Sequence, residues 1–534
     1  MLLTVAVFLP AVVAAALVAM PRLTGPTANR LWVGASLAEL VLVGWMWWRF
    51  DQGSGAGGVT DGLAFEADVR WIPTVDAGYH VGVDGLSLPL LALTAVLFLA
   101  VGIWSLRQTD RPRLHAAAFL FLETACLGTF AALDLILFFV FFDLTIVAMY
   151  FVIAGWGHGN ARRSALKFFL YTFVGSLALL VGFIGLFLGG ETRTFDMVAL
   201  AQDPPLADSP VAGGLVLLAI GIGLAIKTPV FPFHTWLPDA HTDAPAAGSA
   251  ILAGILLKLG TYGFIRIAMP ILPEAWQRWA MVVVVVGVVS VLWGALVALA
   301  QTDVKRMIAY TSVNHMGYVL LGLGAAGLAA DADPQARSIA ITGAVYQMVA
   351  HGLLTGALFL LTGVLWSRGR TYALDRWGGL ARPAPVFAAL FAVSAFGALG
   401  LPGFASFIAE FQIFTGALQA APVATVVAVL GILITAGLFL SAIQRLLAGP
   451  TVIPQDDDPT ESLQPAPAEQ RVPDGGTTTL ARPGIAVGMP DLRRSELVAI
   501  APLLVLAVVL GLLPRLLLEV IEPAAVVVAG LVAR

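Results

Sequence analysis

The sequence predicts an all-α polytopic membrane protein with about 14 transmembrane helices. Of its 534 residues, 59% are hydrophobic and 12% are charged, and the mean hydropathy is +0.91. A soluble domain carries about 25% charged residues. Apolar runs of roughly 18–25 residues, long enough to span a bilayer, recur along the whole chain. Proline or glycine interrupts two of these runs, and the two breaks predict a pair of inverted repeats.

The composition also excludes several kinds of function. The net charge of −4 gives no basic surface for a nucleic acid, and Cys126 is the single cysteine, so no disulfide framework is expected. No cluster of histidine, cysteine and acid has the spacing of metal ligands, and there is no phosphate-binding glycine loop. We therefore expect neither a cofactor nor a metal in this chain, and we expect any coupled redox chemistry to lie in other subunits.

The N-terminal unit, residues 1–110, contains three predicted spans. The first lacks the basic start of a cleaved signal peptide and is interpreted as a retained helix. Glu39 interrupts the second span without any motif around it, which favours a structural role. The three spans are placed near 1–20, 31–48 and 85–105.

Two five-span repeats follow, residues 111–270 (fourth to eighth spans) and 279–448 (ninth to thirteenth spans). Pro229 and Pro232 follow Lys227 in the seventh span, and Gly400 and Pro402 precede Glu410 in the twelfth. Proline removes a backbone donor and breaks the helix, and paired breaks are typical of inverted-repeat transporters. Because five is odd, two breaks five spans apart predict opposite topologies. The spans lie near 114–133, 135–154, 165–189, 211–236, 246–269, 279–300, 304–327, 339–366, 384–418 and 422–447.

The chain ends with two further segments. Residues 449–494 are rich in proline, glycine and acid, which predicts a disordered cytoplasmic linker without a catalytic role. Residues 495–534 hold the fourteenth span, near 496–514, and a tail.

Basic residues alternate between the connections. Odd-numbered connections are rich in arginine, whereas even-numbered ones hold one basic residue or none in most cases, and such a bias predicts that the odd connections are cytoplasmic. The seventh connection, around 238–245, has no lysine or arginine and is an exception. Both termini are therefore predicted on the non-cytoplasmic side of the cell inner membrane.

Several ionisable residues lie within the apolar runs, and eight of them are candidates for a functional series. A charge at this depth is costly, so it normally faces the bundle interior and marks an ion or proton path. With water between its members, this series predicts proton transfer parallel to the membrane plane. Its members, in chain order, are Glu123, Asp143, Lys167, Lys227, Lys258, His315, His351 and Glu410.

Each of these positions also has a structural interpretation. Lys227, Lys258 and Asp143 could instead be ion-pair partners that hold helices together. His315 and His351 could be hydrogen-bonded core histidines, and Lys167 could extend its amine to the membrane surface. For Glu123, the structural and functional interpretations are equally open.

Several motifs resemble the antiporter-like membrane subunits of respiratory complex I. The resemblance spans about residues 80–450, with a weaker match at 492–514. Within it, the sequence after the seventh span and the acid at 410 look like the M type of these subunits. The motifs are GVDGLSLPLL (82–91), DLILFFVFFDLTIVAMYFVIAGWGH (134–158), FPFHTWLPDAHTDAPAAGSAILAGILLKLGTYG (231–263), DVKRMIAYTSVNHMGYVLLG (303–322), YQMVAHGLLTGALFLLTG (346–363) and LPGFASFIAEF (401–411).

The resemblance implies roles for the charged residues. Asp143 would pair with Lys227, Lys258 would be the central bridging lysine, and Glu410 the terminal acid. His315 and His351 would flank a central water chain. The family usually has glutamate where this chain has Asp143, so the contact of the shorter acid with Lys227 could run through water.

The implied function is proton translocation in a NADH:quinone oxidoreductase, driven by redox chemistry elsewhere. NADH and quinone would bind to other subunits, and L-type and N-type subunits would be the neighbours in the bilayer. The alternatives are a subunit of an Mrp-type cation/proton antiporter and a membrane subunit of a related hydrogenase complex.

Overall fold

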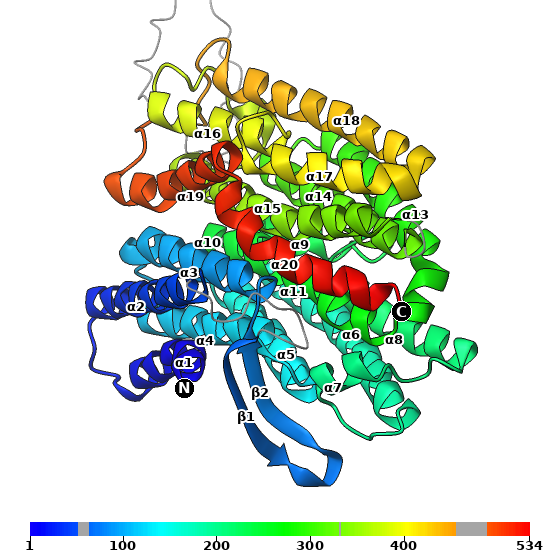
Figure 1. Cartoon of the computed structure of the whole chain (residues 1–534). Coiled ribbons are helices and arrows are strands. Elements are labelled where there is room, and N and C mark those ends of the chain that lie inside the picture. Colours follow the sequence, from blue (N-terminus) through cyan, green and yellow to red (C-terminus); the bar gives the residue numbers. More distant parts are fainter. Residues whose placement is uncertain (52–62, 330–332, 455–488) are drawn as a thin grey trace, which may run out of the picture.

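A computed structural model describes residues 1–51, 63–329, 333–454 and 489–534. In it, three helices form the N-terminal unit, and a β-hairpin separates the second from the third. Figure 1 places α1 and α2 at one edge of the molecule and α18 at the opposite edge. The elements of this unit are α1 (Leu2–Ala19), α2 (Gly25–Asp51), β1 (Ala64–Ile72), β2 (Ala77–Val83) and α3 (Ser87–Trp104).

The first repeat contains the predicted break after Lys227. Its fourth span consists of α8 and the short α9, which are separated by the proline-containing segment 228–236. Its last span is continuous but changes to π-helical geometry over Leu252–Leu256 and Phe264–Ala268. The elements are α4 (Pro112–Ala131), α5 (Leu135–Trp156), α6 (Ala161–Gly189), α7 (Met197–Gln202), α8 (Pro210–Lys227), α9 (Leu237–Asp243), α10 (Ala246–Ile251), α11 (Leu257–Gly263) and α12 (Met269–Ile271).

The second repeat has the same order of packing as the first. In each repeat the first helix packs on the second, the second on the third, and the third on the broken fourth. The break in the second repeat lies between α16 and α17. The elements are α13 (Pro273–Leu299), α14 (Val304–Leu328), α15 (Pro334–Gly369), α16 (Pro385–Ala398), α17 (Ala405–Ala420) and α18 (Pro422–Leu447).

Judged by length and composition alone, twelve helical segments of the described chain are long and apolar enough to cross a membrane. The two other predicted spans are α14, whose polar residues include Asn314 and His315, and the broken pair α16 and α17. The predicted all-α polytopic class is therefore confirmed.

Odd-numbered connections meet at one end of the bundle, which we call the basic end. There Arg113 donates a hydrogen bond to the Met20 carbonyl at 3.1 Å, His158 contacts the Tyr372 hydroxyl at 3.1 Å, and Val304 N–H bonds to Tyr372 O. At the opposite end, the hairpin end, the fourth connection meets the β-hairpin through a bridge between Val81 and Ala132. A second bridge, between Asp134 and Asp196, joins the fourth connection to the sixth.

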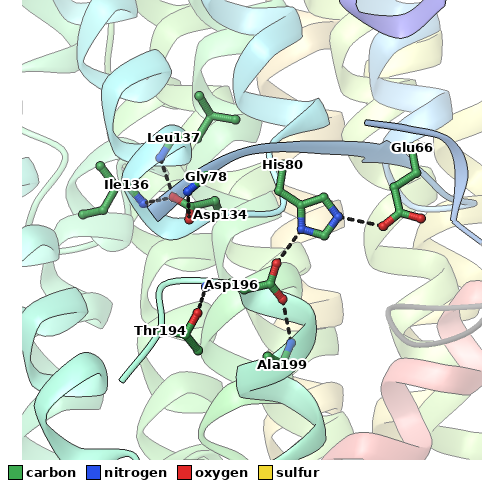
Figure 2. A network of polar contacts seen from close by, with 9 residues as sticks. All are labelled: Glu66, Gly78, His80, Asp134, Ile136, Leu137, Thr194, Asp196 and Ala199. Atoms are coloured by element: carbon green, nitrogen blue, oxygen red, sulfur yellow. Dashed lines mark hydrogen bonds and ion pairs between the residues drawn. The ribbon is translucent and has the colours of Figure 1, made fainter. Parts of the chain in front are cut away.

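The β-hairpin was not predicted from the sequence, because two short strands give a weak signal beside long apolar spans. It is anchored by His80, whose ring contacts Asp196 Oδ2 at 2.5 Å and Glu66 Oε1 at 2.8 Å (Figure 2). Burial lowers the pKa of His80. Its bonds to Asp196 and Glu66 and the negative charges around it raise the pKa by more than burial lowers it, so the net pKa is about 9.

The segment after α18 also differs from the prediction. Most of the expected linker, 455–488, lies outside the described residues. Its two described ends pack on the protein, since Gly378 pairs with Val452, and Asp491 accepts hydrogen bonds from the N–H groups of Val386 and Phe387 at 2.8 and 3.0 Å. The predicted linker boundaries of 449 and 494 are therefore too wide.

The expected tail is a helix. After α19 (Arg494–Leu512), α20 (Arg515–Val532) crosses the bundle and packs on α15 (Figure 1). One face of α20 is buried, and Gln277 of α13 donates a hydrogen bond to the Val532 carbonyl at 2.6 Å. The buried residues recur at three- and four-residue intervals, as expected for an amphipathic helix; they include Leu517, Val520, Ile521, Ala524 and Val528.

Candidate functional site

Lys227 is the last residue of α8, immediately before the first helix break. Its amine donates a hydrogen bond to Thr145 Oγ1 at 2.8 Å and lies 4.6 Å from the ring centroid of Phe142. Both partners belong to α5. The side chain is 1% exposed, so a hydroxyl and an aromatic face take the place of water around the ammonium group.

Asp143 lies between these two α5 residues in the sequence but forms no ion pair with Lys227 within 4.0 Å. The two groups interact electrostatically, and Asp143 Oδ1 is buried without a hydrogen-bond partner among the described residues. The shorter acid therefore stops short of the lysine in this structure. A water molecule or a small movement of α5 is needed to join the two groups.

Lys258 lies on α11, between the two π-helical segments. Its amine donates to the Ala253 carbonyl at 2.5 Å and contacts His351 Nδ1 at the same distance. His351 Nε2 lies 3.2 Å from Ser312 Oγ. If the lysine donates to Nδ1, the ring carries its proton on Nε2 and donates it to Ser312. Side chains from α11, α15 and α14 thus form one contact group, and π-helical geometry is frequent at such functional sites.

His315 extends this group toward the second break. Its ring centroid is 5.2 Å from that of His351, and its Nε2 donates to the carbonyl of Ala398, the last residue of α16, at 3.0 Å. Its Nδ1 has no partner among the described residues. With the ring proton on Nε2, this buried nitrogen can accept one further proton.

Glu410 lies beyond the second break, on α17, and is 4% exposed. The break requires glycine at two positions, because Gly400 and Gly403 have φ angles of +79° and +100°. A Cβ atom at Gly400 would also collide with Glu410 Oε2. The carboxyl group therefore packs directly on the backbone of the break. It also interacts electrostatically with Tyr318, which is buried.

Two predicted site residues lie outside this arrangement. Lys167 binds Asp239 at 2.6 Å and the Thr235 carbonyl at 2.8 Å, and its side chain is 40% exposed. It occupies the basic end rather than the buried series. Glu123 accepts a hydrogen bond from Ser36 of α2 at 2.9 Å, and thus faces the N-terminal unit.

The sequence analysis missed two buried groups near Lys258. His241 is fully buried, stacks on Phe359 at 4.4 Å, and interacts electrostatically with Lys258 and Lys305. Lys305, which lies beside the ninth connection, is also fully buried and donates to the Ala244 carbonyl at 2.5 Å. His241 lies in the same motif, 231–263, as Lys258, and this position in the sequence could have identified it as a candidate site residue.

Within the described residues, no group of three or more histidine, cysteine, aspartate and glutamate side chains could hold a metal ion. The site is therefore built from titratable side chains, hydroxyls and backbone carbonyls. Such groups can bind, orient and pass protons.

Comparison with known proteins agrees with this geometry. The family described as "NADH:quinone oxidoreductase/Mrp antiporter, TM" matches residues 132–435, which include both broken helices. The chain belongs to this family. The resemblance found in the sequence is thereby confirmed, and the antiporter-like fold with it.

Individual members of the family match most of the chain. NADH-quinone oxidoreductase subunit M of Rickettsia conorii is 37% identical over 453 residues, covering 84% of this chain and 83% of that protein. F(420)H(2) dehydrogenase subunit M of Methanosarcina mazei is 38% identical and covers 78% and 81%. In the structure of respiratory complex I from Thermus thermophilus with bound NADH, one chain is 28% identical, with a TM-score of 0.82 and full coverage of both chains.

Proposed function

We propose that this chain is the M-type, non-redox subunit that translocates protons in a NADH:quinone oxidoreductase. The observation that carries the proposal is the buried group of Lys258, His351 and His315, which reaches both helix breaks. Gly260, two residues after Lys258, packs against Thr228 at the first break, and His315 bonds to Ala398 at the second. The relatives named above support the assignment to an oxidoreductase complex.

The proposed mechanism is electrostatic. When Asp143 approaches Lys227, the lysine holds its proton; when they separate, the proton moves toward Lys258 and then Glu410. An opposite charge within about 4–6 Å stabilises a protonated lysine by about 1.4–4 kcal/mol. A membrane potential of about 100 mV opposes each charge by about 2.3 kcal/mol. The change in electrostatic energy at Lys227 is therefore large enough to move one charge against this membrane potential.

The histidines supply the intermediate step in this proposal. Lys258 gives a proton to His351 Nδ1, the opposite ring nitrogen releases one to Ser312 or water, and the neighbouring His315 provides a second ring on the way to Glu410. Each N–H or O–H bond that breaks is replaced by a new N–H or O–H bond on the next group, so the proton is passed on and no net charge is stranded in the apolar interior.

The cellular setting is part of the same proposal. We place the protein in the cell inner membrane, with the basic end in the cytoplasm and both termini on the other side. L-type and N-type subunits would be its neighbours, and other subunits would bind NADH and quinone. The chain itself would hold no cofactor.

The test is proton uptake by membrane vesicles during NADH oxidation, normalised to assembled complex. Lys258→Ala should lower uptake at least tenfold, whereas Arg515→Ala, at a site on α20 with an 83% exposed side chain, should change neither uptake nor assembly. Native uptake in an assembled Lys258→Ala complex would refute the proposal.

An Mrp-type antiporter is the alternative, because the family description includes it. It predicts sodium/proton exchange that needs no NADH, whereas the oxidoreductase proposal predicts none. A membrane subunit of a related hydrogenase complex would instead co-purify with subunits that oxidise another donor. Co-purification with NADH-oxidising iron–sulfur subunits separates these cases.

A further inference from the structure

Glu39 and Glu123 are two membrane-depth carboxyl groups that the mechanism above leaves unused. Both are 0% exposed. Neither oxygen of Glu39 has a hydrogen-bond partner among the described residues, and Glu123 Oε1 has none either. An acid that is fully buried and unpartnered is rare, because desolvation without a compensating bond costs free energy.

The two carboxyl groups meet at the interface between α2 and α4. Ser36 Oγ donates to Glu123 Oε2 at 2.9 Å, and Ser36 lies one helical turn before Glu39, on the same face of α2. Glu39 and Glu123 also interact electrostatically. The side chain of Glu39 is thus directed toward the same interface as that of Glu123.

In the described part of the chain, no lysine, arginine or histidine forms an ion pair with either acid. An ionised carboxylate without a partner is expensive inside a membrane, and two adjacent carboxylates repel each other. A protonated carboxyl group, in contrast, offers both a donor and an acceptor. Protonation of the carboxyl groups therefore accounts for the absence of a cationic partner at this interface.

Cys126 connects the acid pair to Lys227 through electrostatic interactions. Cys126, one turn after Glu123 on α4, interacts with both Glu123 and Lys227. Lys227 in turn interacts with Cys126 on one side and with Asp143 on the other. Cys126 of α4, on the helix that carries Glu123, and Asp143 of α5 therefore both act on the same lysine.

We propose that Glu39 and Glu123 form a proton-binding site at the α2–α4 interface and that this site supplies a proton to Lys227. In the transfer, an O–H bond of Glu123 breaks and an N–H bond forms on the neutral amine of Lys227. The electron pair stays on the carboxylate, and the new ammonium group stabilises it. Glu39 then shares its proton with the ionised Glu123.

The first part of this inference, proton binding, is independent of the proposed function, whereas the transfer to Lys227 rests on it. Infrared spectroscopy of the whole resting complex, without NADH, tests the first part. We expect a carbonyl-stretch band of protonated carboxyl groups that decreases in Glu39→Gln and in Glu123→Gln. The exposed acid in Glu519→Gln is the control and should leave the band unchanged. An unchanged band in both buried variants would overturn the site.

Ser36→Ala covers the case in which a glutamine variant fails to assemble. It keeps both acids but removes the hydrogen bond to Glu123, so it should shift the same band to higher frequency without abolishing it. A band insensitive to Ser36→Ala would also contradict the proposed geometry.

Redox-induced difference spectra test the second part. During NADH oxidation, the native complex should show a change in this band, and Lys227→Ala should lose the change while it keeps the resting band. A resting band that does not respond to turnover in a complex that still pumps protons would overturn the transfer alone. A complex that does not pump would refute the proposed function and leave the proton-binding site standing.

Discussion

Asp143 shows how a single methylene group sets the geometry of a charge pair. Lys227 is bonded to Thr145 and has no ion pair with Asp143, although the two residues are close enough to interact electrostatically. The sequence identifies both groups, because each interrupts an apolar run. It does not identify Thr145, since threonine is common in membrane helices and carries no charge.

We predict that Asp143→Glu retains proton uptake, because the longer side chain reaches toward Lys227. Asp143→Asn should lower uptake about tenfold, which corresponds to the loss of about 1.4 kcal/mol of charge stabilisation. The measurement is NADH-driven uptake in vesicles at equal content of assembled complex. Native uptake by Asp143→Asn would contradict the charge switch.

Glu410 leads to a second prediction at a single residue. The carboxyl group is buried against the glycine break and has no ion pair among the described residues. Glu410→Gln keeps its size but cannot take up or release a proton, so proton uptake should fall at least tenfold. Glu410→Asp should retain much of it. Equal uptake in the native and glutamine forms would leave Glu410 with a packing role only.

Not every ionisable residue could be placed from the sequence. Lys167 appears in an apolar run like the other lysines, but it pairs with Asp239, which lies 72 residues away in the sequence. Lys305 is at the very start of a predicted span, next to a polar connection, yet the fold buries it completely. A sequence shows how far a residue lies from the end of an apolar run, but not which helix covers it.

At the scale of elements, long spans and their breaks could be predicted, whereas short elements could not. Proline and glycine act locally, so the breaks near 229 and 400 follow from the residues themselves. The hairpin and α20 depend on partners far away in the chain. The strands are stabilised by pairing and by His80, and α20 by the bundle surface on which it packs.

The hairpin should be sensitive to pH because of His80. Burial lowers its pKa, while Asp196, Glu66 and Asp68 raise it, for a net value of about 9 against 6.5 when unfolded. The protonated form therefore stabilises the fold fully below about pH 6.5, and this contribution is lost as the pH rises through about 9. Hydrogen exchange of the 64–83 backbone should accelerate over that range.

His80→Asn provides the matched control for this effect. It keeps a polar side chain at the same place but cannot be protonated, so exchange in the hairpin should be faster at neutral pH and should lose its own pH dependence after correction for the intrinsic rate. A native hairpin equally protected at pH 7 and pH 10 would contradict the assigned role of His80.

At the scale of the whole molecule, the inverted repeats account for the position of the site. Each repeat contributes one broken helix, with Lys227 before one break and Glu410 after the other, and the buried group of Lys258, His351 and His315 reaches both breaks. The odd spacing of the breaks was enough to predict opposite topologies. It could not predict the packing of the N-terminal unit, which has no counterpart in the repeats.

One buried ion pair joins that unit to the first repeat. Asp84 Oδ1 caps α3 by accepting from Leu86 and Ser87 N–H, each at 3.0 Å, while its Oδ2 accepts from Arg266 at 2.6 Å. Arg266 also donates to the Tyr262 hydroxyl at 3.0 Å. The next residue, Gly85, has no room for a Cβ atom because the Val520 carbonyl of α20 lies against it. The GVDG sequence therefore brings α3, the first repeat and α20 together.

Asp84→Asn should destabilise the whole protein rather than a single helix. It leaves the Arg266 guanidinium, 1% exposed, without its counter-charge, and removal of one partner from a buried pair costs about 3–5 kcal/mol. Replacement of both partners, Asp84→Leu with Arg266→Met, should recover much of that loss because no unpaired charge remains, although the α3 cap is lost. The measurement is the unfolding temperature of the detergent-solubilised complex. If the single variant were as stable as the native protein, or the double variant less stable than the single one, Asp84 and Arg266 would not be the link between the N-terminal unit and the first repeat.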